Sequence, residues 1–377
     1  METGSSPLYS SHATSVLYEW QLVALSLMLS AIGAALIYSA TAPMGSLGKA
    51  LVIRQLTWIS FGIVIAACLL FFDYKLFEQW GIWFYVFVLL MLVFVWSFGR
   101  ATSGSRRWID LGLMRLQPSE FAKLAIIVVL ASYFHDKVGR GGLTFRDLIN
   151  PFVLTLLPVA LVLIQPDLGT AAVTVLVAVS MVAFIGVEKR TLLWLIGTTV
   201  TLAPIAYFLG EHLLLDYQKK RILTFLNPEY DPVGAGYHII QSQIAIGSGG
   251  LFGKGFLQGT QNQLMFLPVK HTDFVFAVLA EEWGFVGCLV VLLLFSGVLL
   301  RGLAISGRAR DNFGALIAFG CVALIFWHVT INVGMVTGLL PVVGVPLSFL
   351  SYGGSSLLSS FLAISILVNV SMRRFIY

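Results

Sequence analysis

Apolar segments recur along the whole chain, and each is close to the roughly 20 residues that a helix needs to cross a bilayer. The chain is 58% hydrophobic and 11% charged, whereas a soluble domain carries about 25% charged residues. The sequence therefore predicts an all-α polytopic membrane protein, a bundle of about ten transmembrane helices with both termini on one side. The predicted spans are residues 20–40, 51–72, 81–98, 118–134, 150–165, 168–186, 191–209, 274–300, 312–337 and 354–372.

Composition disfavours several classes of protein. The three cysteines, Cys68, Cys288 and Cys321, lie in apolar runs and suggest no disulfide framework. The net charge of +5 comes without a basic run, so no nucleic-acid partner is indicated. Residues 1–19 contain no Lys or Arg, so a secretory signal is not expected, and this segment is predicted to be a cytoplasmic tail.

Positive charges predict the orientation of the bundle. Lysines and arginines are equally numerous on the two sides, but nine of those opposite the termini lie in segments 99–117 and 210–272. Long loops carry little weight in the positive-inside rule, and outside those two segments the counts are 11 against 2 in favour of cytoplasmic termini. The nine cations would then face outside, where they contact lipid headgroups or hold an anionic substrate.

The segment 210–272 is predicted to be a large extracytoplasmic loop between the seventh and eighth spans, and it is too long for a simple connection. Its residues 236–246 have the apolar spacing of a short amphipathic helix at the membrane interface. Residues 247–255 resemble a phosphate-binding loop but fail its pattern, because Ser248 and Gly255 stand where Gly and Ser or Thr are needed. This glycine-rich stretch either brings Lys254 near a ligand or acts as a hinge.

Asp273 lies at the end of that polar segment, where the eighth span begins. A carboxylate at the mouth of a span is costly unless something pairs with it or uses it. One interpretation makes Asp273 the N-cap of a helix that starts at Phe274, and the other makes it functional. Glu281 and Glu282 would lie about 80° and 180° around the helix from Asp273, so they are not expected to form a carboxylate pair with it.

Two further segments carry candidate features. Glu120 and Lys123, near the start of the fourth span, are three residues apart, so they share a helix face and can form a structural pair. Charged groups within a membrane are also functional candidates. The apolar, uncharged segment 338–355 is expected to re-enter the membrane and help build a pocket, because irregular backbone at that depth must be buried in protein or line a cavity. A surface turn is the alternative.

Short distinctive segments follow one another along the chain: Arg106–Ile109, Gln117–Glu120, Gln165–Thr170, Gly236–His238, Gly247–Gly250, His271–Phe274, Asn332–Met335 and Ser351–Ser355. Together they resemble the signature sequences of the SEDS family, named for shape, elongation, division and sporulation. The resemblance extends over nearly the whole chain from Leu36 onward, and residues 266–282 favour the elongation branch over the division branch. One departure is Ser348, which stands where the family usually has the second Pro of Pro-Leu-Pro and puts the exact shape of this loop in doubt.

The resemblance implies one fold and one activity. The family fold is a bundle of ten transmembrane helices with a large extracytoplasmic loop between the seventh and eighth, so residues 1–377 would form a single transmembrane domain. The implied activity is that of a peptidoglycan glycosyltransferase, which polymerises lipid II into glycan strands during cell elongation and cell-shape maintenance at the bacterial inner membrane. The implied partners are lipid II, a class B penicillin-binding protein and other membrane proteins of the elongation complex.

Glycosyl transfer from a lipid pyrophosphate needs a base, positive charge at the leaving pyrophosphate and an apolar groove for isoprenoid tails. Asp273, whose counterpart in the family is held essential, is predicted to be the catalytic base or a metal ligand. His271 either orients Asp273 or is a surface residue at a helix start. The expected substrate-binding residues are Arg106, Arg107, Arg221, Lys254, Lys270, His271 and Ser351. The expected supporting residues are Glu120, Lys123, Gln117, Trp108 and Asp167.

The histidine spacing matches no zinc motif, so a metal is expected to be Mg²⁺ or Mn²⁺ held by carboxylate and pyrophosphate oxygens. A flippase that moves the lipid-linked precursor without chemistry is a second hypothesis, because cavities with buried charge and broken helices also suit transport. A flippase needs charges along a path open to both faces, whereas the candidate charges here gather on the outer face. A scaffold that only recruits partners would leave Asp273 replaceable.

Overall fold

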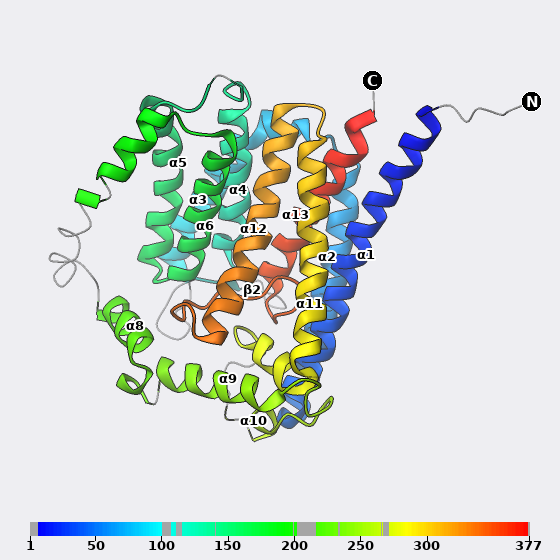
Figure 1. The fold of residues 1–377 in the computed structure, drawn as a ribbon, viewed down its shortest axis with the longest axis vertical. Helices are drawn as coiled ribbons and strands as arrows, with labels where there is room; N and C mark the ends of the chain where they lie inside the picture. The colour runs from blue at the N-terminus through cyan, green and yellow to red at the C-terminus, as the bar shows by residue number, and fades with distance from the viewer. Residues whose placement is uncertain are drawn as a thin grey trace, which may run out of the picture.

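Long helices packed side by side form the body of the protein in the computed structural model (Figure 1). The first helix begins and the last helix ends at one end of this bundle, called here the terminal end, and the opposite end is called the distal end (Figure 1). The structure describes residues 7–99, 107–110, 115–139, 141–198, 200–201, 216–232, 234–264, 266 and 271–375.

The predicted all-α membrane bundle is confirmed. Among the described residues, eight helices are long and apolar enough to cross a membrane, and α4, with 17 residues, is at the short limit for a span. The long helices are α1 (Pro7–Thr41), α2 (Ser46–Leu70), α3 (Lys75–Phe98), α4 (Pro118–Phe134), α5 (Phe145–Ile164), α6 (Leu168–Ile185), α11 (Val275–Gly307), α12 (Asn312–Thr337) and α13 (Gly354–Met372).

The predicted seventh span, residues 191–209, is helical at 191–198 and 200–201, and its other residues lie outside the described part of the chain. The count of ten spans and the place of the large loop between the seventh and eighth therefore stay predictions. Several helices also begin before their predicted spans, and for one of them the cause is a local capping motif. At α5, Thr144 and Asp147 form a capping box, so the helix begins at Phe145 and not at 150.

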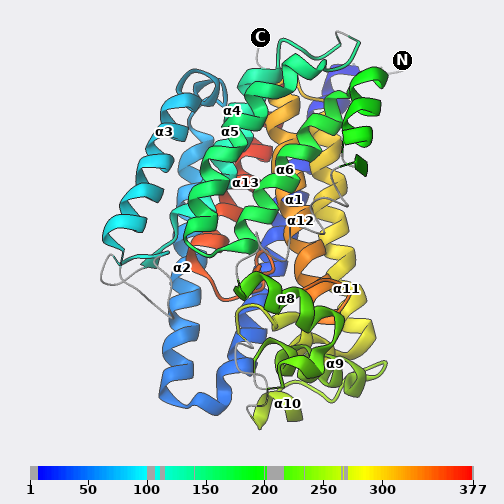
Figure 2. The same cartoon turned by 90° about the vertical axis from the view of Figure 1, so that its left-hand side faces the viewer.

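Three helices occupy the middle of the bundle. Almost every residue of α4 between Pro118 and Ala131 is buried, and most residues of α12 and α13 are buried as well. A helix that is hydrophobic all round is typical of such an interior position. Figure 2 shows α13 among the surrounding helices, and it packs against α1, α2, α4, α11 and α12.

Short elements gather at the distal end (Figures 1 and 2). The antiparallel pair β1 (Ile109–Asp110) and β2 (Arg115–Leu116) precedes α4. The segment 216–263 forms α8 (Asp216–Leu226), η2 (Pro228–Tyr230), α9 (Ala235–Gly249) and α10 (Thr260–Gln263). The helix predicted at 236–246 is confirmed as α9, which runs across the ends of the long helices (Figure 1). It is tied to α12 by a 2.8 Å hydrogen bond from Ser242 Oγ to the Val336 carbonyl.

The segment 339–353, called here the re-entrant loop, folds back into the bundle between α12 and α13. Phe349 and Leu350 are fully buried. Their backbone lies against Gly33, near the middle of the α1 span, where an added Cβ would meet the Phe349 carbonyl oxygen at 2.5 Å. The alternative of a surface turn is therefore wrong, because the loop is buried in protein, while its re-entry into the membrane stays a prediction.

The glycine-rich loop after α9 packs against a kink in α11. At Gly284 the backbone has φ 67° and ψ −164°, a conformation that glycine adopts without steric cost. The amide of Phe285, just after the kink, donates to the Gly250 carbonyl at 2.9 Å, and the amide of Lys254 donates to the Glu281 carbonyl at 3.0 Å. The loop thus pairs backbone groups that the kink releases from the helix.

Gly33→Ala is expected to lower the melting temperature of the purified protein in detergent, because its Cβ would overlap the backbone of the re-entrant loop. Overpacking of this kind costs about 1–3 kcal/mol. Gly307→Ala is the matched control, since it lies in α11 with open space where its Cβ would be, and Ala favours a helix over Gly. An equal loss of stability in both variants would contradict the close packing.

Candidate functional site

Asp273 lies at the distal end, in the turn 271–274 directly before α11. The side-chain amide of Asn332 donates to the Asp273 carbonyl at 2.9 Å and ties this turn to α12. The carboxylate faces the re-entrant loop, since a Cβ on Gly344 would lie 3.4 Å from Asp273 Oδ2. Phe274 is the N-cap of α11, and no side chain caps the helix. The interpretation of Asp273 as the N-cap is therefore wrong, and its carboxylate is directed elsewhere.

Asp167 is anchored at the break between α5 and α6. It is the N-cap of α6, where its carboxylate accepts from the Thr170 amide at 3.2 Å and from the Thr170 hydroxyl at 2.9 Å. The Gln117 side chain donates to the same carboxylate at 2.9 Å. The backbone amide of Gln117 donates to Ser355 Oγ at 2.9 Å, which joins this region to the start of α13. Gln117 and Asp167, both expected as supporting residues, are in direct contact.

Arg107 reaches the same break from the segment that precedes β1. Its Nε donates to the Gln165 carbonyl at 2.8 Å, and its Nη2 donates to the Pro166 carbonyl. The guanidinium is therefore held beside Asp167 by two backbone carbonyls. Arg106, the other arginine expected here, lies outside the described residues.

Charged groups from three parts of the chain act on Asp273. Burial, with the nearby Asp167 carboxylate, raises the pKa of the Asp273 carboxyl to about 6. The guanidinium groups of Arg221 and Arg107 and a hydrogen bond from Thr272 act in the opposite direction on this pKa. We call Asp273, Asp167, Arg107 and Arg221 the Asp273 cluster. At neutral pH its central carboxylate is mostly ionised and able to accept a proton.

A second group of polar side chains is buried inside the bundle. Lys123 Nζ donates to Glu120 Oε1 at 2.9 Å, which confirms the predicted pair. Lys123 Nζ also lies 2.8 Å from His328 Nε2, and the Ser359 hydroxyl donates to Glu120 Oε2 at 3.1 Å. The four side chains are nearly inaccessible to solvent. We call Glu120, Lys123 and His328 the buried triad.

His328 belongs to this site, although its sequence context did not predict it. A polar ring in the long apolar run of α12 was the available signal, but the run gives no sign of a partner 205 residues away. Asn332 was noted as part of a distinctive segment and given no role. Both side chains contact the backbone of the re-entrant loop, at Pro346 and Val345.

His271 and Ser351 shape the wall beside Asp273. The amide of Tyr352 donates to the His271 carbonyl at 2.8 Å, and the two rings meet edge to face with centroids 5.6 Å apart. Ser351 is buried, and its hydroxyl accepts from the Leu347 amide at 2.8 Å. Ser351 therefore closes a turn within the re-entrant loop, while His271 joins this loop to the turn that carries Asp273.

Lys254 lies in the glycine-rich loop, where it contacts an acid of α11. Its Nζ donates to Glu281 Oε1 at 2.8 Å and to Thr260 Oγ1 at 2.8 Å. Glu281 is fully buried, and its neighbour Glu282 accepts from the Ser39 hydroxyl of α1. These acids thus hold the loop and α1 on α11, in keeping with the expectation that they do not pair with Asp273. Lys270 lies outside the described residues.

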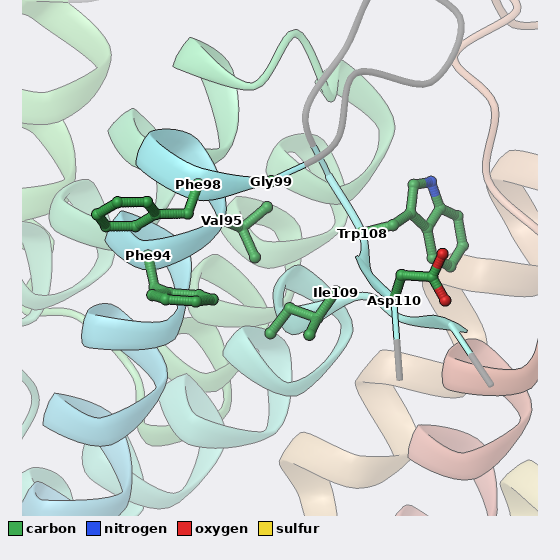
Figure 3. Close-up of a pocket in the computed structure, with 7 residues that line it drawn as sticks. All are labelled: Phe94, Val95, Phe98, Gly99, Trp108, Ile109 and Asp110. Atoms are coloured by element: carbon green, nitrogen blue, oxygen red, sulfur yellow. The ribbon is translucent and has the colours of Figure 1, made fainter. Parts of the chain in front are cut away.

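A cavity of about 450 Å³ opens beside Arg107, between the end of α3 and β1 (Figure 3). Figure 3 shows Ile109 directed toward α3, whereas Trp108 and Asp110 project from the other side of the strand. The lining is apolar on the α3 side, with Phe94 and Phe98 exposed. The residues that line the cavity are Phe94, Val95, Phe98, Gly99, Trp108, Ile109 and Asp110.

Metal-binding groups are few in the described part of the chain, where no three His, Cys, Asp or Glu side chains gather as ligands. Both Asp167 oxygens accept hydrogen bonds, from Thr170 and Gln117. Mg²⁺ is commonly held by one or two carboxylates together with substrate phosphates. Asp273 therefore fits a divalent cation only together with a ligand that brings its own phosphate oxygens.

The fold and the site define a class: a multi-pass membrane protein with a charged site at one end of its bundle, enclosed by a re-entrant loop and a large connecting segment. The particular family follows from sequence. Residues 19–375 match the family profile described as cell cycle protein, FtsW, RodA and SpoVE. The chain belongs to this family, the SEDS proteins.

Characterised relatives are similar over nearly their whole length. The peptidoglycan glycosyltransferase MrdB of Escherichia coli is 42% identical over 353 residues, which cover 92% of this chain and 93% of that protein. Stage V sporulation protein E of Bacillus subtilis is 39% identical over 93% of this chain and 96% of its own. The peptidoglycan glycosyltransferase RodA of Treponema pallidum is 34% identical over 95% of this chain and 98% of its own.

Solved structures agree with the fold. One chain, from a structure described as showing structural coordination of polymerization and crosslinking by a peptidoglycan synthase complex, is 32% identical with a TM-score of 0.80, over 95% of this chain and 98% of that chain. The rod shape determining protein RodA of Thermus thermophilus is 30% identical with a TM-score of 0.69, over 94% of this chain and 97% of its own.

Lys123→Met is expected to destabilise the protein by about 3–5 kcal/mol, because it leaves the buried Glu120 carboxylate without its cation. Thermal unfolding in detergent measures the effect. The double variant Glu120→Gln, Lys123→Met should recover most of the loss, since it removes both buried charges. Lys49→Met is the control, because Lys49 is an exposed lysine at the distal end. If Lys123→Met alone were as stable as Lys49→Met, the Glu120–Lys123 pair would contribute little to the stability of the fold.

Proposed function

We propose that this chain is a peptidoglycan glycosyltransferase that polymerises lipid II into glycan strands during cell elongation and cell-shape maintenance. The observation that carries the proposal is the Asp273 cluster: a carboxylate with a raised pKa, flanked by two arginines, at one end of a membrane bundle. The names of the relatives MrdB and RodA support the reaction type. The donor is then a sugar linked to an undecaprenyl diphosphate.

In the proposed reaction, an acceptor-sugar hydroxyl attacks the anomeric carbon of the donor. The new glycosidic C–O bond forms as the bond to the pyrophosphate breaks, and the hydroxyl proton passes to Asp273. A general base of this kind contributes about 10²- to 10⁴-fold to the rate. The raised pKa of the Asp273 carboxyl supports this role, because a base works best when its pKa is near the operating pH.

Arg107 and Arg221 are the proposed contacts for the leaving pyrophosphate, whose negative charge develops in the transition state. Arginine suits this task because its guanidinium offers forked donors to phosphate oxygens. Arg106 and Lys270 are proposed as further contacts with the pyrophosphate. Lys254 would reach the substrate only by giving up its contact with Glu281, so we assign it the smaller contribution.

The isoprenoid tail needs an apolar groove that is open to the membrane. We propose the α3 wall of the cavity beside β1 for this groove, because Phe94 and Phe98 line it there, whereas Trp108 and Asp110 line the strand side. Arg107 directly precedes Trp108 in the chain. A tail in this cavity would place its pyrophosphate toward the Asp273 cluster. Trp108 would then lie between the apolar and charged parts of the substrate, as an aromatic residue at a membrane interface commonly does.

A divalent cation, Mg²⁺ or Mn²⁺, is proposed to bind together with the substrate. A carboxylate bound to the cation could not also take up the proton, so in this second arrangement Asp273 would hold the cation in place of acting as the base, and the pyrophosphate would supply the other oxygens. When bound, the cation would neutralise charge on the departing pyrophosphate. In that arrangement the negative charge of Asp167 keeps the site electronegative. The Asp167 carboxylate oxygens continue to accept hydrogen bonds from Thr170 and Gln117.

The proposed location is the bacterial inner membrane, with both termini in the cytoplasm and the distal end outside. The distribution of lysines and arginines supports this orientation. A class B penicillin-binding protein is the proposed partner, together with other membrane proteins of the elongation complex. The similar chain in a peptidoglycan synthase complex that coordinates polymerization and crosslinking supports such a partner.

Asp273→Asn is expected to abolish glycan polymerisation from purified lipid II in liposomes with the partner present, a loss of at least about 100-fold, because the amide cannot take up the proton. Glu229→Gln, an exposed acid in the same connecting segment, is the control and should polymerise normally. Equal products from the native chain and a folded Asp273→Asn variant would remove Asp273 from the chemistry. Movement of lipid across the liposomes without polymer would favour the flippase.

The rate at low substrate should follow the ionisation of Asp273. Because the base acts as the carboxylate and its pKa is about 6, kcat/KM should rise with pH up to about 6 and then level off. Arg221→Gln should move this rise to higher pH, since Arg221 lowers the pKa of Asp273. A pH profile of polymerisation measures both, and a rise that shifts to lower pH in the variant would contradict the assignment.

A further inference from the structure

Two side chains on one face of α12 hold the re-entrant loop. Asn332 is fully buried, and its amide nitrogen donates to the Val345 carbonyl at 2.7 Å and to the Asp273 carbonyl at 2.9 Å. His328 lies one helical turn earlier, so it shares this face. Its Nδ1 lies 3.0 Å from the Pro346 carbonyl, the next one along the loop. Two consecutive loop carbonyls are thus held by residues four apart on one helix.

The contacts of His328 determine its tautomer. The Pro346 carbonyl can only accept, so Nδ1 must carry the hydrogen. The Lys123 ammonium can only donate, so Nε2, at 2.8 Å, must be the unprotonated nitrogen. Lys123 is itself oriented by Glu120 at 2.9 Å. The buried pair on α4 therefore keeps His328 neutral, with its donor directed at the loop.

The loop segment that these residues hold lies between the two acids of the Asp273 cluster. Gly344 is close to the Asp273 carboxylate, since a Cβ there would be 3.4 Å from Oδ2. On the other side of this loop segment, a Cβ added to Gly169, near the start of α6, would lie 2.7 Å from the Val343 carbonyl oxygen. A shift of this segment would therefore move Asp273 relative to Asp167, the N-cap of α6.

We propose that His328 and Asn332 are positioning residues, which fix the re-entrant loop and through it the place of the Asp273 carboxylate. In this proposal the Glu120–Lys123 pair acts on the reaction through the tautomer of His328, without touching substrate. The inference rests on the proposed function, because it concerns the geometry of the proposed base. Misplacing a reacting group by about 1 Å can lower a rate about 100-fold, so the loop contacts have a measurable consequence.

Two substitutions of His328 separate its two contacts. His328→Asn keeps an amide donor near the position of Nδ1, and His328→Gln keeps a polar group near the position of Nε2. Purified full-length protein with its partner should show a kcat about 10- to 100-fold lower for His328→Gln, with KM within about twofold, because the loop contact is lost. His328→Asn should stay within about threefold of the native kcat, since Pro346 keeps its donor.

A second readout does not depend on activity. Backbone amides of the loop, such as those of Leu350 and Ser351, should exchange with deuterium faster in His328→Gln than in His328→Asn or the native chain. Ser180→Ala is the matched control, because it removes the hydrogen bond that Trp327 of α12 donates to α6, on a side away from the loop. This control should change neither kcat nor loop exchange.

The outcomes separate the inference from the proposed function. A native chain that makes no glycan would overturn the proposed function, and loop exchange would still test the contacts. Equal loss of kcat in both His328 variants, or unchanged loop exchange in His328→Gln, would overturn the positioning role. If His328→Asn does not fold, Asn332→Asp replaces it: a carboxylate cannot donate, so kcat should fall and loop exchange should rise. Native values in that variant would equally overturn the inference.

Discussion

Polar groups inside a membrane must find their partners within the protein, because no water is available there. This constraint governs the re-entrant loop, whose irregular backbone lies against the middle of α1 at Gly33. Its carbonyls at Val345 and Pro346 are satisfied by two polar side chains of α12. The same constraint governs the kink of α11, whose released backbone groups pair with the glycine-rich loop.

These internal contacts also form the site. The donors that satisfy the loop connect it to the turn of Asp273 on one side and to the buried triad on the other. A connected network of buried hydrogen bonds restricts the movement of its members, which suits a site where a base must be held at a fixed place. The Asp273 cluster itself stays at the distal end, where two arginines offset the burial of its acids.

Contacts between residues close in the chain could be predicted from sequence, whereas contacts between distant residues could not. The Glu120–Lys123 pair was predicted correctly because its partners are three residues apart on one helix. Asp167 and Gln117 were expected as supporting residues, but their contact spans 50 residues and had no sequence signal. Lys254 was expected at the substrate, whereas the fold places it on Glu281. The N-cap alternative for Asp273 failed because the chain makes a turn before α11 begins.

Sequence alone predicts the membrane bundle, the approximate spans and the family, because these depend on local apolar length and on short ordered segments. The folded structure was needed to show that the four residues of the Asp273 cluster meet at one place, and that His328 joins α4 to the re-entrant loop. The physical reason is that side-chain contacts between distant segments depend on how helices pack. The residues around a lone histidine in an apolar run do not indicate which distant residue it contacts.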